Sequence, residues 1–212
     1  MDFTIQEYKN RLHKVQQSMQ KKGIELLISQ DTANIYYLTG YDAWSFYYSQ
    51  CVIIHVNADE PICYVRAQDA GGALIKTYLK KENIVIYPEK YIHTWPNHPY
   101  DGLVELIKTK KWDKLNIGLE MDSHYFTAFC YEKLRQGLPN ANLKDSERLV
   151  NWVRCIKSET EITYMKNAAV ISEKAMKTAM EVINPGVRQC DAVAEIQSAL
   201  FSFTTTIFLA IH

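Results

Sequence analysis

The sequence lacks several features that would assign a protein class at once. Its five cysteines lie far apart and form no C-x-x-C pair. Scattered thiols of odd number indicate free cysteines in a reducing compartment rather than a disulfide scaffold or a zinc site. No apolar run reaches the roughly 20 residues that span a bilayer, and the N-terminus has no signal-peptide core. We therefore expect a cytoplasmic protein without disulfides.

The chain also lacks an excess of either charge. Lysine plus arginine and aspartate plus glutamate balance at 24 each. Bulk charge therefore offers nothing that attracts nucleic acid or an anionic membrane, and neither partner is expected. A hydrophobic fraction of 47% is ordinary for a folded domain with a packed core.

Glycine motifs that cradle phosphate are missing as well. The pair Gly71-Gly72 is the one place that suggests such a loop, but neither G-x-G-x-x-G nor G-x-x-x-x-G-K-[ST] surrounds it. We interpret the pair as a site of close helix packing.

Short apolar runs alternate with amphipathic helical patterns between residues 24 and 136. A run of four or five apolar residues bounded by breakers is typical of a strand that is covered on both faces. The alternation predicts an α/β domain with a largely buried mixed or parallel sheet and helices on its faces. The expected strands are Ile24–Ile28, Cys51–Val56, Pro61–Val65, Ile84–Tyr87 and Leu115–Leu119.

A long helix is predicted to begin at about residue 158. Ser158 and Glu161 have the spacing of a capping box, in which each side chain accepts a hydrogen bond from the other residue's backbone N–H. Apolar residues then recur at spacings of three and four up to Ile183, and Pro185-Gly186 ends the helix. A further helix with Asp191 as N-cap is expected after it.

Residues 31–48 are rich in aromatic side chains, with seven in 18 positions. Two interpretations stay open. The rings could form an aromatic core that joins a helix to the sheet, or Trp44, Phe46 and Tyr47 could project from a loop as a substrate-binding surface. Aromatic side chains dominate both kinds of contact, so their number does not separate the two interpretations.

Two groups of residues are candidate metal ligands. His93 and His98 share a loop, but no cysteine or carboxylate accompanies them at ligand spacing. Glu120, Asp122 and His124 would share one face of an extended segment, as in a facial metal triad. The stronger interpretation is that Asp122 or Ser123 caps a helix from 123 to 135, so no metal ligand or catalytic residue is predicted in this chain.

Several short segments, taken in order, match the pattern of a known family. The early segment is Asn34-Ile35-Tyr36-Tyr37-Leu38-Thr39-Gly40-Tyr41, and Ile117-Gly118-Leu119-Glu120 follows. The strongest segment is Ile156-Lys157-Ser158-Glu159-x-Glu161-Ile162, followed by Pro185-Gly186-Val187. Together they resemble the creatinase/prolidase superfamily. Among the subfamilies, the sequence is most similar to ectoine hydrolases, through residues 39–47, Glu120-Met121-Asp122 and Leu149-Val150-Asn151-Trp152.

The resemblance implies an architecture. Residues 1–148 would form the α/β N-terminal domain, with a mixed sheet and helices on both of its faces, and residues 149–157 a connector. Residues 158–212 would be the truncated first helices of a catalytic domain with the pita-bread fold. In the peptidase members that domain holds two metal ions through two aspartates, one histidine and two glutamates, none of which this chain contains.

The resemblance also implies a function. The full-length protein would be a homodimeric hydrolase that acts on C–N bonds, most like an ectoine hydrolase that opens the cyclic amidine of a small zwitterionic molecule. One alternative is an Xaa-Pro aminopeptidase or dipeptidase, which would take a short peptide and a divalent metal (Mn, Co or Zn). Another alternative is a non-catalytic dimerisation or substrate-capping module. In the first case, Trp44, Phe46 and Tyr47 would form part of a lid over the substrate.

The C-terminal tail departs from the family pattern. A relative would turn through glycines into a strand after Ser202, whereas residues 203–212 contain no glycine. We expect a truncated or frame-shifted reading frame, and a chain that is inactive by itself because its catalytic residues lie beyond its end. The alternative is that this end, residues 203–212, forms a partner-binding strand; Ile207–Ile211 within it is β-prone.

Overall fold

The computed structural model describes residues 2–42 and 47–210, and for residues 203–210 it describes the backbone alone. The chain divides into two compact units, Met1–Ile156 (unit 1) and Lys157–His212 (unit 2). Among the described residues, no helix is both long and apolar enough to cross a membrane.

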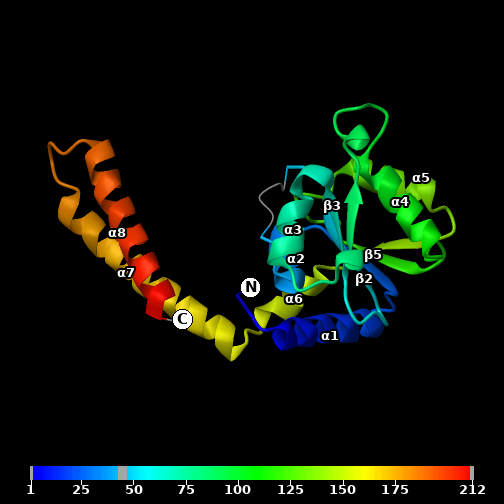
Figure 1. The fold of residues 1–212 in the computed structure, drawn as a ribbon, viewed down its shortest axis with the longest axis horizontal. Coiled ribbons are helices and arrows are strands. Elements are labelled where there is room, and N and C mark those ends of the chain that lie inside the picture. Colours follow the sequence, from blue (N-terminus) through cyan, green and yellow to red (C-terminus); the bar gives the residue numbers. More distant parts are fainter. Residues whose placement is uncertain (1, 43–46, 211–212) are drawn as a thin grey trace. The chain divides into compact units, whose positions relative to one another are not determined.

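Unit 1 is built on one mixed sheet of six strands, in the order β4-β3-β2-β1-β5-β6 (Figure 1). The strands β1, β5 and β6 run parallel to one another, and β2 is antiparallel to both β1 and β3. The edge strand β4 is parallel to β3. The strands are β1 (Leu26–Ser29), β2 (Cys51–His55), β3 (Ile62–Arg66), β4 (Ile84–Tyr87), β5 (Asn116–Leu119) and β6 (Asn142–Asp145).

Six α-helices and three short 3₁₀ turns complete the described part of unit 1. The helices are α1 (Ile5–Lys21), α2 (Thr32–Thr39), α3 (Ala70–Lys76), α4 (Pro99–Thr109), α5 (Ala128–Gly137) and α6 (Leu149–Cys155). The 3₁₀ turns are Ala67–Asp69, Lys81–Asn83 and Glu89–Tyr91.

The sheet has a hydrophobic core on each of its faces, because successive side chains of a strand point to opposite sides. Leu27 of β1 belongs to the cluster under α1, α2, α3 and α6, whereas its neighbours Leu26 and Ile28 belong to the cluster under α4 and α5. Both clusters consist of buried residues, so β1, β2 and β3 are apolar on both sides. The predicted mixed α/β fold with helices on both faces is therefore confirmed.

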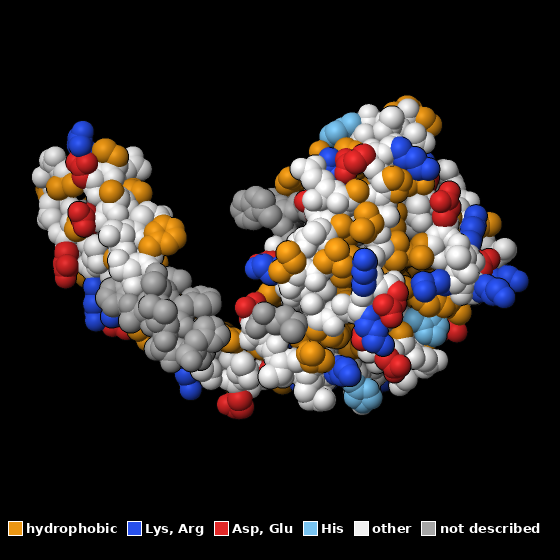
Figure 2. Space-filling view, in the orientation of Figure 1, with side chains coloured by type: hydrophobic (Ala, Val, Ile, Leu, Met, Phe, Trp, Pro, Cys, Tyr) orange, Lys and Arg blue, Asp and Glu red, His pale blue; other side chains and the backbone are white. Residues whose placement is uncertain are grey.

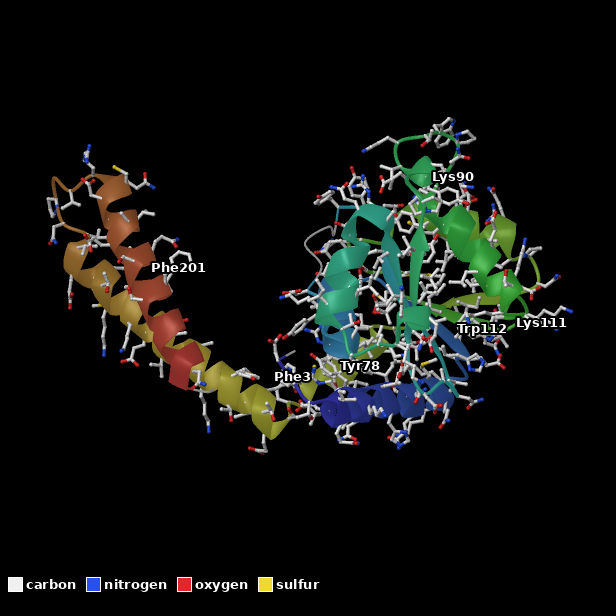
Figure 3. All side chains as sticks on the ribbon, in the orientation of Figure 1. Phe3, Tyr78, Lys90, Lys111, Trp112 and Phe201 are labelled. Atoms are coloured by element: carbon white, nitrogen blue, oxygen red, sulfur yellow. The ribbon has the colours of Figure 1, made fainter. Side chains whose placement is uncertain are left out.

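The turn after α2 depends on a glycine. Gly40 ends the helix in the left-handed conformation, with φ of 80°. A Cβ atom at this position would lie 2.7 Å from the hydroxyl oxygen of Tyr8. The ring of Tyr8 stacks on Tyr78 with 5.0 Å between ring centroids, and Phe3 meets its edge; Figure 3 labels Phe3 and Tyr78 at the same end of unit 1.

Gly71 does not have the role that the sequence suggested. The interpretation of Gly71-Gly72 as a site of close helix packing is wrong for Gly71, since no atom lies within 4 Å of the position that its Cβ would take. Gly72 has ordinary contact distance to Tyr41. The pair lies on the exposed side of α3, where small side chains leave the surface open.

The helix expected at residues 123–135 begins later than predicted. Its N-cap is Thr127, whose hydroxyl accepts a hydrogen bond from the N–H of Cys130. The prediction that Asp122 or Ser123 caps it is wrong, because these residues form a turn in which Asp122 pairs with Arg148. The sequence analysis also missed β6, since only one of its four residues is a large apolar one.

Unit 2 is a pair of helices, α7 (Glu159–Val182) and α8 (Gln189–Ala210), which contact each other. The predicted capping box is confirmed: the Ser158 hydroxyl accepts from the Glu161 N–H, and the Glu161 carboxylate accepts from the Ser158 N–H. Pro185 and Gly186 lie in the turn between the helices, with φ of 90° at Gly186.

The alternative of a C-terminal strand is wrong for the described part of that segment. The backbone of residues 203–210 continues α8 as a helix. No glycine or proline interrupts the chain after Gly186, so the helical hydrogen bonds can continue, and the β-propensity of threonine and isoleucine is a weak preference that context overrides.

Candidate functional site

Unit 1 carries a surface hollow beside the loop that joins β4 to α4. We call it the aromatic hollow, and its volume is about 450 Å³. No aspartate or glutamate lies among the described residues that line it. Its lining includes Tyr47, Tyr48, His93, Trp95, His98 and Phe129.

Local sequence signals explain how the loop is held. Pro88 follows β4, and the 3₁₀ turn after it buries Tyr91 in the core. At the other end, His98 and Asp101 form a capping box for α4, and Pro99 occupies its first helical position. A proline there costs no hydrogen bond, because the first N–H groups of a helix have no partner within it.

Aromatic rings form one wall of the hollow. The indole of Trp95 stacks on Phe129 with 5.2 Å between ring centroids and 21° between planes. The imidazole of His98 contacts Phe129 edge-on, with 5.1 Å between ring centroids. Because Trp95 is 80% exposed, most of the indole is open to a ligand.

A backbone hydrogen bond indicates which tautomer the neutral ring of His98 adopts. Its Nδ1 atom accepts a hydrogen bond of 3.2 Å from the backbone N–H of Tyr100. An imidazole nitrogen that accepts carries no proton, so the proton of the neutral ring lies on Nε2. Burial lowers the pKa of His98; Lys133 lowers it further, and Asp101 opposes them.

Ion pairs support the hollow from outside. Arg66 donates to both carboxylate oxygens of Glu89 at 2.7 to 3.0 Å, which lowers the pKa of Glu89. The same guanidinium lies 4.1 Å from the ring centre of Tyr48. On the opposite side, Lys133 pairs with Asp101 and donates to the carbonyl oxygen of Pro96. These contacts fix both ends of the loop.

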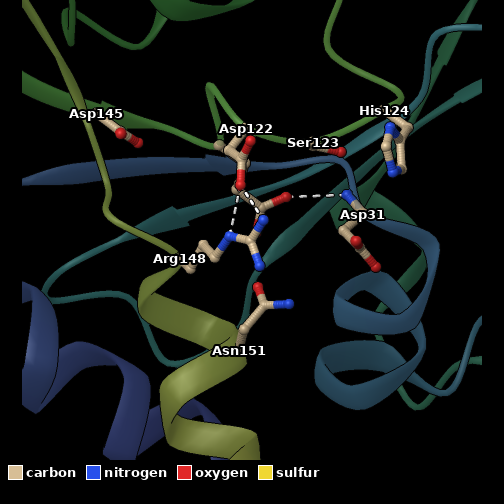
Figure 4. Close-up of a pocket in the computed structure, with 8 residues that line it drawn as sticks. Asp31, Asp122, Ser123, His124, Asp145, Arg148 and Asn151 are labelled. Carbon is tan, nitrogen blue, oxygen red and sulfur yellow. Dashed lines mark hydrogen bonds and ion pairs between the residues drawn. The ribbon is translucent and has the colours of Figure 1, made fainter.

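A second, smaller hollow of about 160 Å³ lies where β1, β5 and β6 end, and we call it the polar hollow. Figure 4 shows the ion pair of Asp122 with Arg148 and, facing it, Asp31 at the start of α2. In open parallel sheets, ligands commonly bind at this edge. The lining carboxylates already have partners in the protein: Asp31 caps α2 and Asp145 accepts from the N–H of Glu147.

The floor of the polar hollow is the buried carboxylate of Glu120. It accepts hydrogen bonds from the hydroxyl of Ser29, the backbone N–H groups of Gln30 and Asp31, and the side-chain amide of Asn34, at 2.7 to 2.9 Å. Burial raises the pKa of Glu120, and these four hydrogen bonds oppose the rise. The group ties the end of β5 to the end of β1 and the start of α2.

Neither set of metal-ligand candidates forms a metal site in the described part of the chain. Glu120 is turned inward to its four donors, Asp122 pairs with Arg148, and His124 is exposed. His98 caps α4, and His93 hydrogen-bonds the hydroxyl of Tyr48. Nowhere in residues 2–42 and 47–210 do three histidine, cysteine, aspartate or glutamate side chains come together as metal ligands.

The predicted lid residues are only partly placed. Tyr47 lines the aromatic hollow and is 65% exposed, as an interaction surface requires. Trp44 and Phe46 lie in residues 43–46, outside the described residues. A role of these three residues in binding stays a prediction.

The sequence did not indicate which other aromatic residues line this hollow together with Tyr47. Trp95 and Phe129 are 34 positions apart, and no local pattern indicates that they stack. His98 was weighed as a metal ligand, but the H-P pair before a helical pattern was a signal for a helix start that could have identified it as the cap.

Comparisons with known proteins identify relatives over most of the chain. The family model described as Creatinase/Prolidase N-terminal domain matches residues 11–156. An uncharacterized hydrolase/peptidase of Sinorhizobium fredii is 43% identical over 96% of this chain and 52% of its own length. The ectoine hydrolase of Halomonas elongata is 41% identical over 92% of this chain and 49% of its own length.

Solved structures share the fold. Dipeptidase PepE from Mycobacterium ulcerans superposes with a TM-score of 0.72 at 13% identity, over 95% of this chain and 51% of that one. Prolidase from Pyrococcus furiosus superposes with a TM-score of 0.67 at 18% identity, over 91% of this chain and 52% of that one. The chain spans about half the length of the curated relatives it matches.

Proposed function

The chain belongs to the creatinase/prolidase N-terminal domain family, and from this membership we propose that it is part of a hydrolase that opens a cyclic amidine, as an ectoine hydrolase does. The observation that carries the substrate class is the aromatic hollow. An amidinium is a delocalised cation, and it is attracted to the face of an aromatic ring. In the absence of lining carboxylates among the described residues, the exposed indole of Trp95 and the ring of Tyr47 are the groups that would hold it.

We propose that unit 1 acts as the capping part of the enzyme. In a homodimer, the aromatic hollow of one subunit would cover the substrate at the catalytic centre of the other, and Tyr47 would belong to the lid together with Trp44 and Phe46. The 212-residue chain by itself would bind the substrate weakly and would not hydrolyse it. The cell compartment that we propose is the cytoplasm, where a small solute of this kind would be degraded.

The second candidate is a metal-dependent Xaa-Pro aminopeptidase or dipeptidase. The favouring observation is a 22% identical relative, the Xaa-Pro dipeptidase of Pyrococcus furiosus. The described residues do not fit a divalent metal, since no three ligand side chains gather in them, so we derive no step through a metal ion.

The two candidates differ in the ligand that the aromatic hollow takes. We would titrate the ¹⁵N-labelled chain with ectoine and, separately, with glycyl-proline, and follow the indole N–H signals of Trp95 and Trp152 by NMR. Trp152 is a matched control, because it is an exposed tryptophan on α6 and does not line the hollow. A shift of the Trp95 signal with ectoine alone is expected.

A response to glycyl-proline and none to ectoine would favour the peptidase. Equal shifts of both indole signals would contradict a site in the hollow. Turnover of either compound by the purified chain, measured with and without Mn²⁺, would contradict the proposal that the chain alone is inactive.

A further inference from the structure

His98 is the polar side chain of the aromatic hollow whose geometry is most constrained. The ring is half-buried, and its Nδ1 atom is occupied by the N–H of Tyr100. No hydrogen-bond partner of Nε2 occurs among the described residues. The neutral ring therefore has an N–H donor that no described residue uses.

The charges around this donor suit an anionic ligand group. No carboxylate lines the hollow within the described part of the chain, so nothing there repels an anion. The carboxylate of Asp101, three positions after His98, accepts hydrogen bonds from the backbone N–H of His98 and from the ammonium group of Lys133. Lys133 adds a positive charge 5.3 Å from the ring centre of Phe129.

The donor and the aromatic stack share one ring. Phe129 contacts His98 on one side and Trp95 on another, at centroid distances of 5.1 and 5.2 Å. Trp95 and His98 both line the hollow, so one ligand held in it can contact the indole and the imidazole. A molecule with a delocalised cation at one end and a carboxylate at the other matches both groups.

We propose that His98 is a specificity-determining residue of the aromatic hollow: its capping bond holds it as the Nε2–H tautomer, and this N–H donates a hydrogen bond to the carboxylate of a zwitterionic ligand whose cationic part lies on Trp95. The inference rests on the proposed function, since it takes the same hollow as the ligand site. It adds that His98 selects ligands that carry a carboxylate.

The tautomer is tested without any ligand. Long-range ¹H–¹⁵N correlation spectra of the full chain distinguish the two neutral tautomers of each histidine from the imidazolium form. We expect His98 to be the neutral Nε2–H tautomer at pH 7. The Nδ1–H tautomer or a charged ring at this pH would overturn the inference.

Selection of the carboxylate is tested with a pair of ligands. Ectoine and 2-methyl-1,4,5,6-tetrahydropyrimidine share the cyclic amidinium, and only ectoine carries the carboxylate. We expect the full chain to bind ectoine about tenfold more tightly than the second compound, because a hydrogen bond to a charged group has a free energy that gives at least this ratio.

The variant His98→Asn separates recognition from folding. Asparagine is a good N-cap, and its side-chain oxygen can accept from the N–H of Tyr100 as Nδ1 does. Its NH₂ group is also a donor, but it lies closer to the backbone than Nε2–H does and does not reach the same ligand oxygen. In this variant the tenfold preference for ectoine should disappear, while circular dichroism and thermal unfolding stay near those of the unmutated chain. His124→Asn is the matched control, since His124 lines the other hollow, and it should keep the preference.

The outcomes separate the two proposals. Equal binding of both compounds by the unmutated chain would refute the role of His98 and leave the aromatic recognition of the amidinium standing. Binding of neither compound would refute both. A tenfold preference that survives in a folded His98→Asn chain would also refute the role of His98.

Discussion

The side-chain amide of Asn34 donates a hydrogen bond of 2.7 Å to the carboxylate of Glu120, 86 positions later in the chain. The same amide donates to Asn151, and its oxygen accepts from Arg154. One asparagine thus connects the end of β5 with α2 and α6. These contacts join the first and last parts of unit 1 around a buried charge.

The variant Glu120→Gln should destabilise unit 1 by about 2–4 kcal/mol, because one oxygen that accepts hydrogen bonds becomes an NH₂ group facing donors. The hydroxyl of Ser29 can rotate to accept a hydrogen bond from this NH₂ group. The side-chain amide of Asn34 cannot flip to do so without losing the hydrogen bond that its oxygen accepts from Arg154. Urea unfolding of unit 1 measures the loss. Glu132→Gln is the control: this exposed carboxylate pairs with Arg135 at the surface, and its loss should leave stability unchanged.

Gly40→Ala should destabilise unit 1 by about 2 kcal/mol or more, because the left-handed conformation is costly for alanine and its Cβ would collide with the hydroxyl of Tyr8. Gly71→Ala should have the opposite effect on stability. It lies in α3 with open space around it, so alanine should stabilise by about 0.5–1 kcal/mol. Equal effects of the two substitutions on the unfolding midpoint would contradict this account.

Stability should depend on pH through His98. Its pKa is lowered in the folded chain by burial, so on acidification the unfolded chain binds a proton before the folded chain does. The contribution of neutral His98 to stability is therefore complete above about pH 6.5, the pKa of histidine in the unfolded chain. It decreases as the pH falls from there toward the lower pKa of His98 in the folded chain. Denaturant unfolding between pH 7.5 and pH 5 should show a shallower pH dependence in His98→Asn than in the unmutated chain. Parallel curves for the two proteins would be evidence against a neutral His98.

Ser158→Ala should weaken the start of α7 by about 1 kcal/mol, since its hydroxyl accepts from the N–H of Glu161. Ser172→Ala is the matched control within the same helix. Its hydroxyl donates to the carbonyl oxygen of Ala168, a bond that contributes little, so alanine should be neutral or slightly stabilising. Hydrogen exchange of the first-turn amides of α7 measures the difference, and equal exchange in both variants would argue against the cap.

The full chain should self-associate. Met176, Met180 and Ile183 of unit 2 are 63%, 77% and 64% exposed. Figure 2 shows hydrophobic side chains at the surface of this unit, and Figure 3 labels Phe201 of α8, which is also exposed. Contiguous exposed apolar surface favours association. Sedimentation should reveal species heavier than the 24.6 kDa monomer, reduced in Met180→Gln and unchanged in Lys166→Gln. A monodisperse monomer would refute this prediction.

Much of the fold follows from local sequence. Apolar runs such as Ile84–Tyr87 predicted strands because five or fewer apolar residues between breakers can be buried on both faces. The capping box of Ser158 and Glu161 predicted the start of α7 to the residue. The strand β6 was missed, because an edge strand such as Asn142–Asp145 needs little apolar surface and is held by pairing with β5.

The α/β class, the long helix of unit 2 and the family follow from the sequence alone, because periodicity, caps and short motifs are properties of neighbouring residues. The site depends on the tertiary structure. The stacking of Trp95 on Phe129 and the four hydrogen bonds to Glu120 join residues 34 to 91 positions apart. No local pattern encodes such contacts, because they form only when the fold brings distant segments together.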